Sequence, residues 1–157
     1  MHRGWKSLLA VGGVVLATGC AAPHEPQVTF YSHGNSTAVD PALFCDPTGE
    51  ECDTAEGSVG RLRVPDHAPV QISVPAEVAS TPWQVVFLYR DAAGRQLDGR
   101  SAVFAPDERH AYTLTMPKDG VQLEHVEVQR FSAVLTAGAN GGVNFGIGGA
   151  WVLQTHG

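Results

Sequence analysis

The chain has 157 residues, of which 43% are hydrophobic and 17% charged, and its formal net charge is −6. This length suits one domain, and the apolar fraction excludes a disordered polar chain. The 18 glycines and 10 prolines favour many turns over long helices. An acidic surface is repelled by phosphate backbones and anionic head groups, which argues against nucleic-acid binding and against electrostatic docking to a membrane.

Residues 1–19 have the pattern of an export signal. Arg3 and Lys6 give a basic start, and 8–18 is an uncharged, mostly apolar run. A permanent spanning helix needs about 20 apolar residues, and this run is shorter. The sequence therefore predicts a signal peptide over 1–19 rather than a transmembrane anchor.

The signal ends in Leu16-Ala17-Thr18-Gly19-Cys20. This stretch resembles the lipobox of bacterial lipoproteins, in which a small residue precedes a cysteine that is lipidated and becomes the first residue of the mature chain. The resemblance implies a diacyl or triacyl anchor, palmitate included, attached at Cys20 on the extracytoplasmic face of the cell membrane. A single acyl chain holds only reversibly, whereas two or three chains anchor stably. The alternative is an ordinary secretory signal cut nearby, with Cys20 present by chance.

Export also bears on the other two cysteines, because paired thiols outside the cytoplasm are expected to oxidise. One anchor and one pair account for the three cysteines, which predicts a disulfide between Cys45 and Cys52. Closing so small a ring stabilises a fold by roughly 2 to 3 kcal/mol. A redox or metal site is the alternative, but the spacing is not Cys-x-x-Cys and no histidine is nearby in sequence.

The chain divides into a leader, a tether and a domain. Residues 20–26 predict a short, proline-bearing tether, and 27–157 predict a single β-sandwich domain. A tether of this length reaches only on the order of 20 Å when extended. The domain is therefore expected to lie close to the bilayer surface.

Short alternating or β-branched runs, each bounded by turn residues, predict an all-β fold. In the clearest run, Trp83, Val85, Phe87 and Tyr89 share one face, and no segment shows helical periodicity over a useful length. About eight strands with regular turn spacing predict an immunoglobulin-like antiparallel β-sandwich, with Trp83 in its core. The expected strands are 28–32, 37–45 (broken at Pro41), 70–74, 83–90, 97–104, 112–116, 121–131 and a last strand through 153, with a hairpin turn at 91–95.

The segment 137–150 is rich in glycine. Asn140-Gly141-Gly142 is a strong tight-turn signal, and apolar residues then alternate with asparagine and glycine over 143–148. The pattern predicts a hairpin that returns into the last strand. Glycine along one strand face permits close approach of another backbone or of a ligand, so the segment has either a packing role or a role as a contact surface.

Three stretches carry a resemblance: Val70 to Pro75, Thr81 to Phe87, and Asp98 to Ser101. The early run 28–31 and the two cysteines of the ring fit the same pattern. They resemble the actinobacterial lipoproteins grouped as domain of unknown function 2771, over nearly all of the mature chain. The resemblance implies an envelope lipoprotein of mycobacteria and their relatives. It brings no activity and no catalytic residues.

Metal-ligand spacing is not found in the sequence. Asp46, Glu50, Glu51 and Asp53 crowd the cysteine ring and offer oxygens that suit calcium, but their spacing departs from the known twelve-residue calcium loop. A solvated acidic loop is the preferred interpretation. The histidines of the mature chain are far apart in sequence, at His24, His33, His67, His110, His125 and His156.

Catalytic motifs are equally sparse. Ser101 lacks the Gly-x-Ser-x-Gly pattern and falls within an expected strand. Glu124 and Glu127 are three residues apart, which on a regular strand places them on opposite faces and not in one cleft. No glycine-rich loop joins a strand to a helix, so no nucleotide site is indicated. We therefore expect no catalytic residue, no cofactor and no metal.

Three roles are compatible with these observations. The preferred one is a noncatalytic module that presents sheet edges and loops to other envelope proteins. The second is a carrier or sensor of an apolar envelope molecule, held between the sheets or in the glycine-rich hairpin. The third is an enzyme whose site is assembled from distant loops, since a fold alone does not exclude chemistry. A core filled by large side chains would exclude a ligand between the sheets.

Overall fold

The computed structural model describes residues 25–46, 48–137 and 143–157. The signal peptide, Cys20, the tether up to residue 24 and the turn at 140–142 lie outside the described residues. The described elements are β1 (Val28–Ser32), β2 (Asn35–Val39), β3 (Leu43–Cys45), β4 (Cys52–Thr54), β5 (Val59–Arg63), β6 (Val70–Ser73), α1 (Ala76–Ala79), β7 (Trp83–Asp91), β8 (Gln96–Arg100), β9 (Ala111–Leu114), β10 (Gly120–Ala137) and β11 (Val143–His156).

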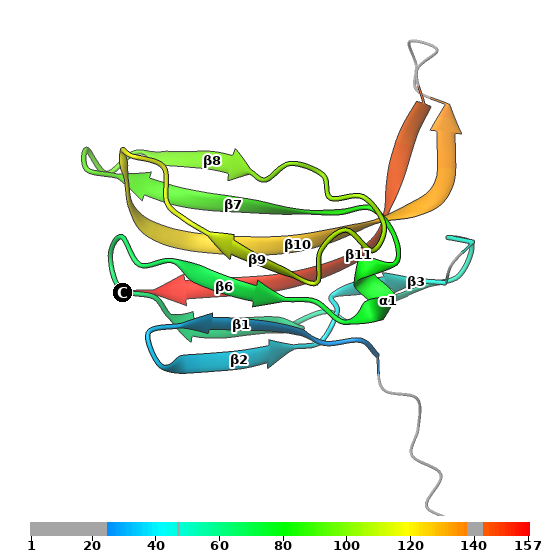
Figure 1. The fold of residues 1–157 in the computed structure, drawn as a ribbon, viewed down its shortest axis with the longest axis horizontal. Helices are drawn as coiled ribbons and strands as arrows, with labels where there is room; N and C mark the ends of the chain where they lie inside the picture. Colours follow the sequence, from blue (N-terminus) through cyan, green and yellow to red (C-terminus); the bar gives the residue numbers. More distant parts are fainter. Residues whose placement is uncertain (1–24, 47, 138–142) are drawn as a thin grey trace, which may run out of the picture.

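The strands form two sheets that pack as a sandwich (Figure 1). The first sheet has the order β2-β1-β6-β9, and the second has the order β4-β3-β11-β10-β7-β8, with β5 paired to β11. The all-β sandwich predicted from the sequence is confirmed. All the described strand pairs are antiparallel except β5 with β11, which is parallel.

The described residues contain eleven strands, against the eight or so expected, and one short helix. The missed elements carry little local signal. On β5 only Leu62 is buried, so the strand lacks alternation, and its pairing comes from β11 far away in sequence. Helix α1 is a single turn after Pro75, too short to show helical periodicity. It links the first sheet to the second by joining β6 to β7.

The core fills the space between the sheets, and β1, β6 and β7 contribute alternate residues to it. Strand β7 buries every second side chain, and β1 does the same. Trp83, predicted as a core residue, is fully buried, and its ring lies 4.6 Å from that of Phe104. Trp151 is also fully buried, and its Nε1 donates to the carbonyl of Pro26 at 2.7 Å. The start of the described chain is therefore held against β11.

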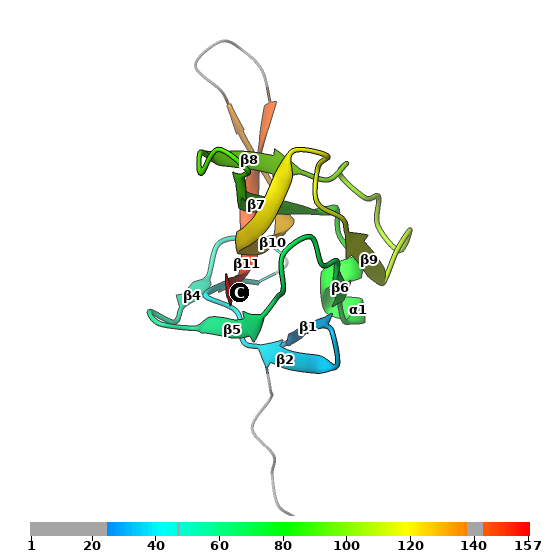
Figure 2. The ribbon, with the colours of Figure 1, turned by 90° about the vertical axis from the view of Figure 1, so that its left-hand side faces the viewer.

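Strands β10 and β11 continue past the sandwich as a two-stranded ribbon. The register of β10 on β7 ends at the Arg130–Trp83 pair, whereas β10 and β11 stay paired as far as Ala137 and Val143. We call residues 131–137 and 143–148 the arm. It bends away from the two sheets in Figure 1 and projects beyond the body again in the view of Figure 2.

Two described glycines of the glycine-rich segment serve packing at the root of the arm. A Cβ on Gly148 would lie 2.8 Å from Cβ of Ser132, and one on Gly149 would lie 2.9 Å from the ring of Trp151. Both distances are shorter than side chains tolerate, so glycine lets β10 and the tryptophan ring approach β11 closely. No helix within the described residues has the length and apolar character needed to cross a membrane.

Candidate binding site at the base of the arm

Two hollows lie where the arm leaves the sandwich, and Phe131 lines both. The first, which we call the Arg130 cavity, has a volume of about 330 Å³. The second, which we call the apolar hollow, has a volume of about 490 Å³. Besides Phe131, the Arg130 cavity is lined by Phe44, Cys45, Asp46, Glu77, Ser80, Thr81, Arg130 and Ser132. The apolar hollow is lined by Pro82, Val103, Phe104, Ala105, Pro106 and Glu108.

Arg130 is a buried cation on the inward face of β10. The residue is 5% exposed and follows the inward residues Val126 and Val128 in the strand's alternation. Its Nη2 donates to the carbonyl of Cys45 at 2.7 Å and to that of Gly148 at 2.9 Å. These bonds tie β10 to β3 and β11, the strands that flank the root of the arm.

The rest of the guanidinium is poorly satisfied. Nη1 makes one long contact, 3.4 Å to the carbonyl of Glu77 on α1, and Nε is buried without a hydrogen-bond partner. The ring of Phe44 lies beneath the group, 4.4 Å from Cζ. Among the described residues, no carboxylate oxygen lies within 4.0 Å of this guanidinium. Burial lowers the pKa of Arg130, but a guanidinium keeps its proton in proteins, so the charge persists.

Asp46 lines the same cavity, and its negative charge acts on Arg130. This charge raises the Arg130 pKa and so opposes the lowering that burial causes. Its carboxylate accepts from the hydroxyl of Thr48 and from the amides of Glu50 and Glu51. These bonds, the Thr48 hydroxyl foremost, lower the pKa of Asp46 and keep it ionised. Asp46 thus organises its own loop rather than pairing with the guanidinium.

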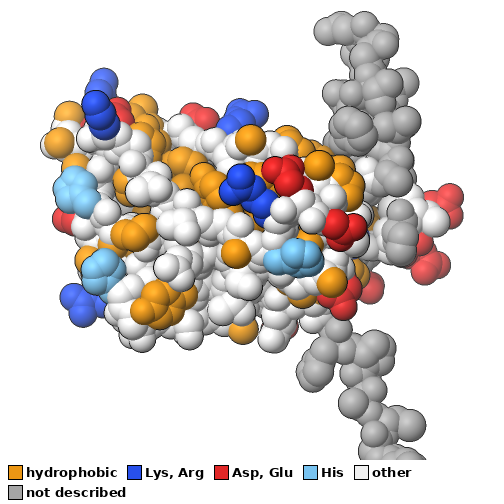
Figure 3. Space-filling view, viewed as in Figure 1, with side chains coloured by type: hydrophobic (Ala, Val, Ile, Leu, Met, Phe, Trp, Pro, Cys, Tyr) orange, Lys and Arg blue, Asp and Glu red, His pale blue; other side chains and the backbone are white. Residues whose placement is uncertain are grey.

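The loop that holds Asp46 is closed by the predicted disulfide. Cys45 and Cys52 are bonded, which confirms the pairing, and they face each other in the β3–β4 ladder. The acids of this ring form no metal cluster: within the described part of the chain, no group of three His, Cys, Asp or Glu side chains is placed to share an ion. Figure 3 shows acidic side chains gathered at the end of the molecule where α1 and β3 lie.

The apolar hollow opens at the surface beside the arm. Val103, on its wall, is 54% exposed. Phe131 is paired directly with Ile147 of β11, which is 42% exposed. Directly paired residues of antiparallel strands share a face, so Ile147 extends the apolar surface from the hollow onto the arm.

The sequence placed Glu124 and Glu127 on opposite faces, and this was wrong. A register shift between Leu123 and His125 interrupts the alternation, so that Leu123 and Val126 are both buried. A bulge of this kind turns the intervening residues outward, and both glutamates lie on the outer face of the sheet. They still form no pair, because each is held by different partners.

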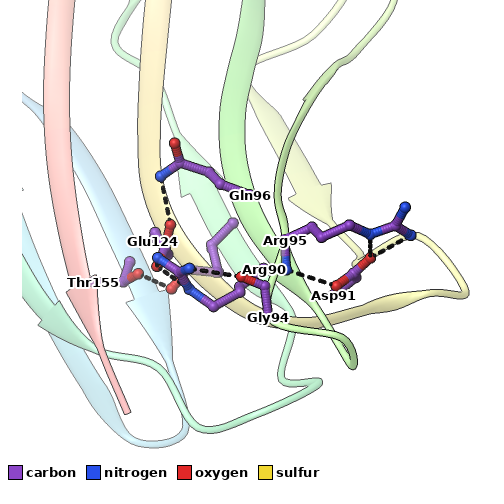
Figure 4. A network of polar contacts seen from close by, with 8 residues as sticks. Arg90, Asp91, Gly94, Arg95, Gln96, Glu124 and Thr155 are labelled. Atoms are coloured by element: carbon purple, nitrogen blue, oxygen red, sulfur yellow. Dashed lines mark hydrogen bonds and ion pairs between the residues drawn. The ribbon is translucent and has the colours of Figure 1, made fainter.

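Glu124 belongs to a network at the β7–β8 turn (Figure 4). It accepts from Arg90 at 2.8 Å and from Gln96 at 2.7 Å. In the same turn, Asp91 accepts from the amides of Ala93 and Arg95 and forms an ion pair with the Arg95 side chain. The charged side chains of this network are paired, Arg90 with Glu124 and Arg95 with Asp91, which is the arrangement of a structural turn.

The other sequence candidates also have structural contacts. The hydroxyl of Ser101 accepts from the amide of Val85 and donates to the carbonyl of Ala102, so it caps the β7–β8 pairing. His67 contacts the carbonyl of Gly120, and His125 lies 3.9 Å from Glu127. Neither histidine shares a partner with the other.

Arg130 was not identified from the sequence. A signal for it exists, because position 130 falls on the same face of the expected strand 121–131 as Val126 and Val128. An arginine on a core-facing position requires buried acceptors, and this conflict marks the site. The acceptors come from β3, β11 and α1, whose convergence no local pattern reveals.

The fold and this site define a class: a β-sandwich protein with a projecting β-arm and, at the base of the arm, a cavity lined by a buried arginine. A family model described as "Protein of unknown function (DUF2771)" matches residues 21–156, and the chain belongs to that family. It is similar to uncharacterized proteins of Mycobacterium bovis and of two Mycobacterium tuberculosis strains, CDC 1551 and H37Rv. Each is 33% identical over 131 residues, which cover 82% of this chain and 78% of the relative. No solved structure matches the chain.

Proposed function

We propose that this protein is a lipid-anchored lipoprotein of the cell envelope and a noncatalytic interaction module that binds another envelope protein through the arm. The observation that carries the proposal is the arm itself. The backbone of the arm continues beyond Arg130, the last residue of β10 that pairs with β7. On the other side, β3 pairs with β11 only at Gly149 and Ala150, so it does not cover the arm either. A ribbon that leaves its sheet presents strand edges on which another chain can form main-chain hydrogen bonds.

Site-specific photocrosslinking in intact cells tests this proposal. A photoreactive phenylalanine analogue is placed at Ile147 on the arm, and in a matched control at Tyr31 on β1, which has nearly the same exposure (42% and 41%). We expect the Ile147 variant to give one discrete protein adduct that the Tyr31 variant does not give. If Ile147 yields no adduct, or if both positions yield the same set, the arm is not the docking element.

The anchor is tested separately with Cys20→Ser. We expect the wild-type protein to remain in the membrane fraction and to label with a palmitate analogue, and the variant to lose the label and leave the membrane. A variant that matures normally and stays embedded would refute attachment at Cys20. Comparing the crosslinks of both forms then separates the effect of the anchor from the effect of the arm.

A second candidate function, a carrier or sensor of an apolar envelope molecule, is favoured by the apolar hollow. The core argues against a ligand held between the sheets. Its positions are occupied by Trp83, Phe87, Leu114 and Trp151, none more than 7% exposed, and Tyr112 packs against them. The hollow instead lies beside the glycine-rich hairpin, the other place where such a ligand was expected. Its walls are mostly hydrophobic, which suits an apolar ligand.

A further inference from the structure

We propose that the base of the arm binds an apolar molecule that carries a single carboxylate, with the carboxylate on Arg130 in its cavity and the apolar part along Phe131 into the apolar hollow. The inference rests on the second candidate function and names its ligand class. It is built on three observations: a buried cation with no ion-pair partner among the described residues, a cavity that this cation lines, and an apolar hollow that shares Phe131 with that cavity.

The cation is the first observation. A guanidinium has five N–H donors. The two on Nη2 are used by Cys45 and Gly148, and the one described contact of Nη1 is long, at 3.4 Å. Nε has no hydrogen-bond partner among the residues that the structure describes. Burying a charge is unfavourable unless it is paired, and a carboxylate oxygen is a charged acceptor that would pair it. A ligand oxygen on Nη1 would replace the weak contact with Glu77.

The cavity is the second observation. It adjoins the guanidinium and has a volume of about 330 Å³, enough for a carboxylate and the first carbons of a chain. Ser80 and Thr81 line the α1 side, where their hydroxyls donate to the carbonyls of Glu77 and Val78. Ser80 is exposed, so the cavity is open at this wall.

The charge of the surroundings favours a monoanion over a dianion. Asp46 and Glu77 both line the Arg130 cavity, and Asp46 stays ionised. Both acids repel an added anion, and they repel a phosphate monoester with nearly two charges about twice as strongly as a singly charged carboxylate. The acidic side chains at this end of the molecule also repel small free anions, so the affinity for the proposed ligand has to come from the apolar part of that ligand.

The apolar surface is the third observation. Phe131 lines both hollows, and Ile147 is paired beside it on the arm. Phe131 is therefore the residue along which a chain leaving the carboxylate would reach the apolar hollow. Each methylene that it buries contributes about 0.8 kcal/mol.

The test uses the full chain in micelles of the uncharged detergent dodecyl maltoside. Four probes are titrated: octanoate, its neutral analogue octanamide, octyl phosphate and inorganic phosphate. Binding is followed by the Nε–H resonance of Arg130 in protein labelled with ¹⁵N-arginine, which reports this site and not uptake by the micelle. We expect octanoate to bind saturably and at least tenfold more tightly than each of the other three probes.

Two variants leave the carbonyl contacts of Arg130 untouched. Ser80→Trp fills the cavity from its exposed wall and should abolish octanoate binding. Asp46→Asn removes the repelling charge while keeping an acceptor for the amides of Glu50 and Glu51, and it should narrow the preference for octanoate over octyl phosphate severalfold. If Arg130 were merely structural, octanoate would not shift its Nε–H resonance in the wild type, and neither variant would have a binding affinity to change.

The outcomes separate the inference from the function on which it rests. Equal binding of octanoate and octanamide, both lost in Ser80→Trp, would overturn the carboxylate inference and leave an apolar carrier standing. No shift with any probe would overturn both. Octanoate binding that survives Ser80→Trp would place the ligand elsewhere and overturn the inference.

Discussion

Replacing Arg130 with methionine tests whether this side chain holds the root of the arm together. Methionine keeps an unbranched apolar stem but removes the two bonds from Nη2 to the carbonyls of Cys45 and Gly148. Hydrogen bonds from a charged group contribute about 1.5–3 kcal/mol each, and recovering the desolvation cost of the buried cation offsets part of this loss. We expect the free energy of unfolding to fall by about 3 kcal/mol.

Arg90→Met is the matched control. Arg90 lies on β7 in the same sheet and forms an ion pair with Glu124 at 2.6 Å, but its side chain is 43% exposed. Exposed ion pairs contribute about 0–1 kcal/mol, so this variant should change little. Urea unfolding of the purified proteins, followed by fluorescence of the buried Trp83 and Trp151, measures both values. If the two variants differ by less than about 1 kcal/mol, the carbonyl contacts do not stabilise the fold as reasoned here.

Three further predictions concern stability. The double substitution Cys45→Ala with Cys52→Ala should lower the free energy of unfolding by about 2–3 kcal/mol under oxidising conditions, and equal urea midpoints with and without the disulfide would contradict this. Gly99→Ala would place a Cβ 2.3 Å from Cζ of Phe87 and should cost about 1–3 kcal/mol, part of which Phe87→Leu should restore in a double-mutant cycle. The folded-state pKa of Asp91 is lowered, chiefly by the hydrogen bond from the amide of Arg95. The stability that Asp91 contributes is therefore present above the unfolded pKa of about 3.9 and is lost as pH falls through the folded value. Asp91→Asn should therefore lose less stability than the wild type on acidification below about pH 4, and parallel pH curves would count against this assignment.

The regular part of the fold could be predicted because its signal is local. Alternation over 83–90 places Trp83 and Phe87 on the core face, and the structure buries both. The gap at Pro41 separates β2 from β3 as expected, and the ring of Cys45 and Cys52 closes as the cysteine count indicated. The periodicity of apolar side chains and the turn residues indicate these features locally, without reference to the rest of the chain.

The irregular part depends on partners distant in sequence. Strand β5 forms because β11 offers it a parallel edge, although only Leu62 of its five residues is buried. The bulge near Glu124 follows from the register of β10 on β7, and one extra residue there reverses the faces that simple alternation predicts. Register is a property of two strands together, so neither strand alone encodes it visibly.

The candidate site shows the same division. Sequence by itself predicted the sandwich, its buried Trp83 and the closed acidic loop, because periodicity and cysteine pairing are read along one segment of chain. Only the tertiary structure brought α1, β3 and β11 around Arg130, and among the described residues it placed no carboxylate oxygen within 4.0 Å of that buried charge. The reason is physical: the electrostatic environment of a charge is set by atoms within a few ångströms in space, and those atoms lie 18 to 85 residues away along the chain.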